Sequence, residues 1–198
     1  MAGQNVGVNS EPDADDPILD AAHDEFSMVG IQRTSMDTVA RQAGVSRATL
    51  YRRFPTKYSL LEAVGIRAGK WAGKRLARLA EGQPPQEVVV TAFVESARMF
   101  RSVPFFREMV DYAMSRYGQD LAREIFVREK LITYMIGNIA ATLRKAGATM
   151  PEEELRTVAE IQLRMVMSFV LSPSRTMDFD DDKSVRKFVS TYLSPMVY

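Results

Sequence analysis

Apolar residues recur at every third or fourth position along most of the chain, which is the spacing of helices that bury one face. Asp16 and Pro17 start the first such pattern and Gly30 ends it, because aspartate caps a helix and proline fits its first position. The apolar face between them consists of Ile18, Leu19, Ala22, Phe26 and Val29. No stretch alternates convincingly between apolar and polar residues, so the sequence predicts an all-α protein.

Two short helices follow, separated by the segment AGV. Thr34 is predicted to cap the first, with Asp37 at its third position, and Ser46 is predicted to cap the second. Pro55 stops the second helix, because proline disfavours a helical residue before it and lacks an N–H of its own. Gly44 lets the backbone turn steeply between the two, so the pair predicts a helix-turn-helix motif.

The remaining pattern predicts a second helical domain. A fourth helix is expected from Thr56 to about residue 80, where the segment EGQPP marks a domain boundary. We expect residues 16–64 to form the first domain, with the fourth helix continuing to about 80, and residues 81–198 to form the second. Residues 1–15 are polar and acidic and are expected to be a disordered tail. Further helices are expected at about 86–102, 104–115, 119–145, 152–171 and 182–193.

The net charge of +1 hides a strong asymmetry along the chain. Residues 1–30 carry seven acids and no lysine or arginine, a net charge of −7. Residues 31–78 carry eleven lysines and arginines against Asp37 and Glu62, a net charge of +9. A solvated surface explains many charge runs, but this one coincides with the helix-turn-helix motif. A polyanion would be attracted to this middle segment alone.

Composition and motifs also exclude several other classes of protein. The chain has no cysteine, which excludes disulfides and thiolate zinc sites. It shows neither a secretory signal nor an apolar run of the ~18 residues that a membrane span needs, so we expect a cytoplasmic protein. No nucleophile–base order or phosphate-binding loop emerges, so no enzyme activity and no cofactor are expected. The acid-rich runs at 152–154 and 178–182 suit helix starts, so no metal site is expected.

The second short helix has an outward face suited to DNA. At 100° per residue, Leu50 and Phe54 fall on its buried side. The face left outside consists of Ala48, Thr49, Arg52 and Arg53, with Arg47 and Tyr51 at its edges. Small side chains permit close approach to a major groove, arginine can donate two bonds to guanine, and threonine can contact the thymine methyl. Ser46, Tyr51 and Lys57 flank this face, where phosphates would run.

Residues 18–64, ILDAAHDEFSMVGIQRTSMDTVARQAGVSRATLYRRFPTKYSLLEAV, resemble the TetR family of bacterial transcriptional regulators. The resemblance is carried by Ala22, Phe26 and Gly30 at four-residue steps, by TSMDTVARQAGVS, and by TLYRRF followed by Lys57 and LL. It implies double-stranded operator DNA as a partner. Acidic residues stand before the first helix where many relatives carry basic ones, which disfavours a DNA-binding N-terminal arm. The implied base-reading residues are Arg47, Ala48, Thr49, Arg52 and Arg53, and the implied phosphate anchors are Thr34, Ser46, Tyr51 and Lys57.

The resemblance also implies a small-molecule effector bound between the C-terminal helices. Flexible methionines and flat aromatic rings suit an irregular apolar cavity, which favours a lipophilic or aromatic ligand. The alternative for each such residue is ordinary core packing. The candidate lining residues are Phe93, Ala97, Phe100, Phe106, Met109, Met114, Tyr134 and Met135.

A homodimer is expected for two reasons. One recognition helix contacts few base pairs, so specificity asks for two copies on a palindrome. The helix at 152–171 has apolar residues on more than one face, which must be covered on both sides. The expected interface residues are Ile161, Arg164, Met167, Phe169, Leu171, Phe188 and Tyr192.

The sequence therefore predicts a ligand-responsive transcriptional regulator. By resemblance it would be a homodimeric repressor that a small apolar molecule releases from palindromic operator DNA. A DNA-binding dimer without a ligand is one alternative, and its C-terminal interior would be fully packed. A helical enzyme acting on a hydrophobic substrate is the other, and its cavity would hold a polar dyad.

Overall fold

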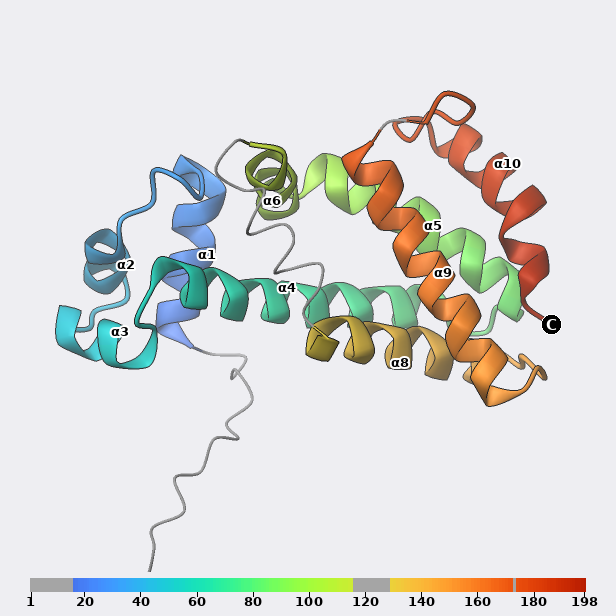
Figure 1. The fold of residues 1–198 in the computed structure, drawn as a ribbon, viewed down its shortest axis with the longest axis horizontal. Coiled ribbons are helices and arrows are strands. Elements are labelled where there is room, and N and C mark those ends of the chain that lie inside the picture. Colours follow the sequence, from blue (N-terminus) through green and yellow to red (C-terminus); the bar gives the residue numbers. More distant parts are fainter. Residues whose placement is uncertain (1–15, 116–128, 173) are drawn as a thin grey trace, which may run out of the picture. The chain divides into compact units, whose positions relative to one another are not determined.

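The structure, a computed structural model, describes residues 16–115, 129–172 and 174–198 (Figure 1). Every regular element in these ranges is a helix, which confirms the predicted fold class. The chain divides into two compact units, residues 1–68 and 69–198, and α4 (Lys57–Leu79) contributes to both. This division falls within the helix that the sequence predicts to join the two domains.

The N-terminal unit consists of α1 (Pro17–Val29), α2 (Met36–Gln42), α3 (Arg47–Arg53) and the first part of α4. The prediction that Val29 is buried is wrong, because α1 ends at this exposed residue. The chain then turns at Gly30, whose φ is 90°, and Ile31 takes the inner position instead. The core of the unit is formed by Ile18, Leu19, Ala22, Phe26, Ile31, Val39, Leu50, Leu60, Leu61 and Val64.

Side-chain caps start three of these helices. Asp16 accepts hydrogen bonds from the amides of Ile18 and Leu19, at 3.0 and 3.4 Å. Ser46 caps α3, as predicted, with its hydroxyl 3.1 Å from the Thr49 amide. The cap of α2 is Ser35, whereas the sequence predicted Thr34. Each cap satisfies an amide that the first turn of a helix otherwise leaves unpaired.

The described residues of the C-terminal unit form the second part of α4 and five further α-helices. These are α5 (Pro85–Ser102), α6 (Pro104–Met114), α8 (Glu129–Lys145), α9 (Glu152–Leu171) and α10 (Asp182–Tyr192), followed by a 3₁₀ turn, η1 (Ser194–Met196). The bounds agree with the predicted helices within a few residues. The exception is the start of the helix expected at 119–145, because residues 116–128 lie outside the described residues.

Two helix pairs organise the core of this unit: α5 packs against α10, and α8 packs against α9 (Figure 1). Phe93 and Ala97 of α5, Leu155 and Ala159 of α9, and Val185 of α10 are all buried in one cluster. None of the described helices combines the length and apolar character that a membrane span requires.

Candidate nucleic-acid interface and internal cavity

The exposed surface of α3 carries most of the predicted DNA-binding residues. Leu50 and Phe54 are buried, as the helical spacing predicts. The opposite side presents Arg47, Ala48, Tyr51 and Arg52 to solvent, with Ser46 and Thr49 at the helix start. The described residues offer Arg52 no ion-pair partner, so its guanidinium remains available to an outside acceptor.

The start of α3 is organised by two contacts. The Ser46 and Thr49 hydroxyls lie 2.9 Å apart, in addition to the capping bond. Arg47 is 69% exposed, and its Nε lies 2.7 Å from Oδ1 of Asp37 on α2. This ion pair was not predicted, although Asp37 is one of only two acids in the basic segment. It orients the arginine and leaves most of its surface open.

Arg53 is placed differently from Arg52. Its guanidinium forms an ion pair with Asp16, the cap of α1, whose side chain is only 2% exposed. The guanidinium carbon also lies 5.1 Å from the centroid of the Phe54 ring. Arg53 therefore ties the end of α3 to the start of α1, a role that its position on the outward face did not suggest.

Thr34 and Lys57 form a second internal tie. Lys57 Nζ donates to the carbonyls of Gln32 and Thr34, at 2.8 and 3.1 Å, and burial lowers the pKa of this amine. Thr34 is buried, and its hydroxyl donates to the Gly30 carbonyl at 2.8 Å. The expectation that the Thr34 side chain anchors a phosphate is not supported by this position. The two residues hold the turn before α2 against the start of α4.

An apolar, partly open cavity of about 150 Å³ lies in the C-terminal unit, lined by α4, α5, α6, α8 and α9. Four of the predicted lining residues face it: Phe93, Phe100, Phe106 and Met135. The lining also includes residues that the sequence prediction did not assign to it, among them Met99, Gln162, Leu163, Val166 and Met167. Sequence reasoning missed the α9 residues because that helix was assigned wholly to an interface.

The other four predicted lining residues lie elsewhere. Ala97 is fully buried in the helix core and Met109 is half-buried outside the cavity lining. Met114 and Tyr134 are exposed. The Tyr134 ring faces the Lys70 amine at 5.9 Å, on the outside of the unit. Helical spacing identifies apolar positions, but it does not tell a cavity wall from a core or an exposed edge.

The model of the bacterial regulatory proteins of the tetR family matches residues 18–64 of this chain. Residues 18–64 are therefore a DNA-binding domain of the TetR family of transcriptional regulators. An uncharacterised HTH-type transcriptional regulator of Mycobacterium tuberculosis is 26% identical over 93% of this chain and 85% of its own length. The match over residues 18–64 confirms the resemblance seen in the sequence.

Solved TetR-type structures share the fold over most of both chains. The TetR family repressor AlkX from Dietzia sp. strain DQ12-45-1b, implicated in n-alkane biodegradation, superposes with a TM-score of 0.71 at 20% identity, covering 94% of this chain and 98% of AlkX. RolR in complex with resorcinol gives a TM-score of 0.62 at 14% identity, covering 91% of this chain and 85% of RolR. At these identities the likeness extends to the fold alone.

The structure places the predicted interface residues in three different settings. Phe169, Phe188 and Tyr192 form an aromatic cluster across α9 and α10, with ring centroids 5.5 and 5.1 Å apart, and Tyr192 is 64% exposed. Met167 belongs to the cavity lining instead. The others are at least partly exposed: Ile161 and Leu171 are half-buried, and Arg164 pairs with Glu160 on its own helix.

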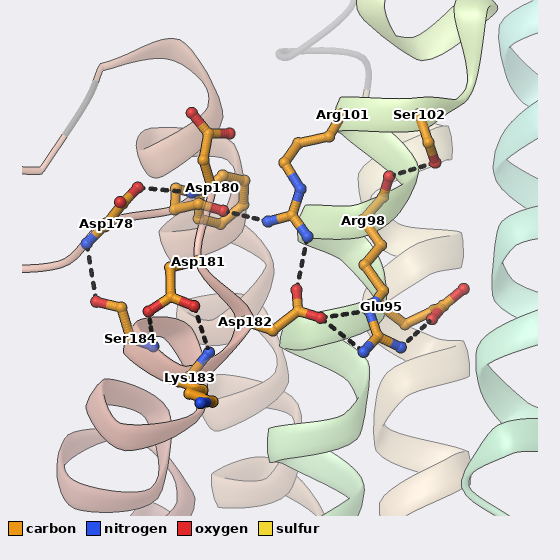
Figure 2. A network of polar contacts seen from close by, with 11 residues as sticks. Glu95, Arg98, Arg101, Ser102, Asp178, Asp180, Asp181, Asp182, Lys183 and Ser184 are labelled. Atoms are coloured by element: carbon orange, nitrogen blue, oxygen red, sulfur yellow. Dashed lines mark hydrogen bonds and ion pairs between the residues drawn. The ribbon is translucent and has the colours of Figure 1, made fainter.

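An ion-pair network joins α4, α5 and α10 in the C-terminal unit of the regulator. Glu95 is buried on α5 and accepts from Arg75 Nε of α4 at 2.7 Å. Asp182, at the start of α10, faces both Arg98 and Arg101 of α5, and its oxygens accept from them at 2.7 and 2.6 Å (Figure 2). The hydrogen bonds from Arg98 and Arg101 lower the pKa of Asp182.

Proposed function

We propose that this TetR-family regulator is a homodimeric repressor that binds palindromic operator DNA through α3 and leaves it when a small apolar molecule occupies the cavity. The observation that carries the proposal is the double contribution of α4. Lys57 at its start is bonded within the helix-turn-helix unit, while Gly69, Ala72 and Leu76 further along line the cavity. A ligand that displaces this wall acts on the helix that directly follows α3.

The surface of α3 supports insertion into a major groove. Ala48 permits close approach, and Arg47 and Arg52 offer guanidinium donors that suit guanine edges. The hydroxyls of Ser46 and Tyr51 are placed at the rim for phosphates. A dimer would present two such helices about 34 Å apart, one to each half-site of a palindrome.

The aromatic cluster on α9 and α10 supports pairing with a second copy. Tyr192 is largely exposed although its ring packs against Phe188, which in turn meets Phe169 edge to face. Large exposed aromatic residues are enriched at protein interfaces. Two α9–α10 pairs related by a two-fold axis would cover this face as a four-helix bundle.

The cavity favours a ligand-responsive regulator over the two alternatives. A dimer without an effector needs no hollow of about 150 Å³ between its helices. An enzyme acting inside the cavity needs an acid or a base, even to activate a hydroxyl such as that of Ser96, and the described lining residues include no titratable side chain. The polar groups in the lining are those of Ser96, Asn138 and Gln162.

The test begins with an operator selected from random DNA by the purified protein. A thermal-shift screen of small aromatic and aliphatic compounds then finds ligands, because a ligand at a hundredfold excess over Kd stabilises by about 2.7 kcal/mol. We expect such a ligand to weaken operator binding by the native protein. Ala92→Leu, which fills part of the cavity, should bind the operator and fail to respond. A tight cavity ligand that leaves operator affinity unchanged would refute induction.

A further inference from the structure

Gln162 is a buried amide in an apolar wall. Its side chain lies on α9 and is 5% exposed, and its Nε2 has no hydrogen-bond partner among the described residues. Leaving a buried donor unpaired costs about 1–3 kcal/mol, so such groups in folded proteins usually have a partner. The missing acceptor therefore requires an explanation at this position.

The position of Gln162 supplies one. It lines the cavity of about 150 Å³ and also a neighbouring hollow of about 60 Å³. The amide stands where the two hollows adjoin, because they also share Gly73, Leu76, Ala92, Asn138 and Ile139. Around it the lining is largely apolar, with Phe93 and Leu163 among its neighbours in the wall. A molecule in the larger hollow would place its atoms within reach of this amide.

We propose that Gln162 selects the effector by donating its unpaired N–H to an oxygen of an otherwise apolar molecule. This inference rests on the proposed role of the cavity as the effector site. A hollow of about 150 Å³ is large enough for one benzene ring. The ligand class is therefore a single aromatic ring, or a chain of similar volume, that carries one carbonyl or hydroxyl oxygen. A pure hydrocarbon would fill the same volume and leave the donor unpaired.

Acetophenone and α-methylstyrene test the role of Gln162. The two probes have the same skeleton and differ in that a carbonyl oxygen replaces a methylene group. Calorimetric titrations of the full chain give a Kd for each, and the quantity compared is the ratio of the two Kd values. Gln162→Met keeps the length of the side chain and removes the donor. We expect the ratio to favour acetophenone about three- to tenfold more in the native protein than in this variant.

Comparing the ratio of Kd values between the native protein and Gln162→Met cancels the difference in hydrophobicity between the two probes. Thr157→Val, an exposed change on the same helix, is the matched control and should keep the native ratio. An unchanged ratio in Gln162→Met would overturn the inference while leaving the cavity as the effector site. Failure of both probes to bind the native protein would overturn the inference and also the assignment of the cavity as the effector site. Gln162→Leu provides a second variant, and neither variant should lower the Tm, because each removes an unpaired buried donor.

Discussion

Arg47 Nε lies 2.7 Å from Asp37 Oδ1, so α2 orients the first side chain of α3. The ion pair is exposed and contributes little to stability, about 0–1 kcal/mol. Its consequence is positional, because it holds an arginine at the entry of the recognition helix while its remaining N–H groups stay open. The ion pair thereby presets a guanidinium that is 69% exposed to solvent.

Arg47→Ala should weaken binding to the selected operator by about 1–3 kcal/mol and relax the preference at one base pair per half-site. Binding to scrambled DNA should change far less. Gel-shift titrations on the operator and its single-base variants measure both effects. Asp37→Asn keeps the arginine and should cost less than Arg47→Ala. An equal loss on all sequences would mean that Arg47 contacts only the backbone.

Lys57→Ala should lower the free energy of unfolding by about 1–3 kcal/mol, because it removes two charge-assisted hydrogen bonds to backbone carbonyls. DNA binding should then weaken alike on all sequences. Urea denaturation measures the first effect, and gel-shift titrations across a salt series measure the second. Unchanged stability with a salt dependence shallower by about one contact per subunit would instead place the amine on a phosphate, as the sequence suggested.

Asp16→Asn and Asp16→Ala separate the two contacts of Asp16. Asparagine still caps α1 but cannot pair with Arg53, so this variant should lose about 1–3 kcal/mol, because the carboxylate that it replaces is nearly buried. Alanine removes the cap as well and should lose about a further 1 kcal/mol. Thermal unfolding of the two variants measures the difference. Equal losses would show that the cap adds nothing beyond the ion pair.

Tyr192→Lys should weaken self-association at least tenfold, about 1.4 kcal/mol, because it places a charge in the proposed dimer interface. The side chain is largely exposed, so the fold of the subunit should persist. Sedimentation velocity at micromolar concentration measures the shift from dimer to monomer. Arg156→Glu, an exposed charge change near the start of α9, is the control. A variant that remains dimeric would place the interface elsewhere.

Asp182→Asn should destabilise the protein at neutral pH and lose this effect in acid. Arg98 and Arg101 hold the pKa of Asp182 below its ordinary value, so the folded pKa lies below the unfolded one. The stabilisation is complete above the unfolded pKa of about 4 and disappears as the pH falls through the folded value. Denaturant midpoints of both proteins, compared across this window, should converge at low pH. A constant gap would assign the effect to packing.

The sequence predicted the helices and the buried side of α3 because both follow from spacing, caps and breakers. It could not predict that Arg53 is paired while Arg52, the residue before it, has no ion-pair partner among the described residues. Arg53 meets Asp16 through the tertiary fold, at a separation that no local pattern encodes. The cavity was only half predicted for the same reason. By residue type, both Met167 and Tyr134 could line a cavity or lie at the surface. Only the packing of the helices places Met167 in the cavity wall and Tyr134 outside it.

The chain contains a single tryptophan, Trp71, whose ring centroid lies 6.5 Å from that of Phe106 in the cavity wall. The Arg75 guanidinium faces the same indole at 6.0 Å. A molecule entering the cavity would change the surroundings of this one fluorophore, so its emission should report occupancy directly. The protein carries its own optical probe, on the helix that joins its two units.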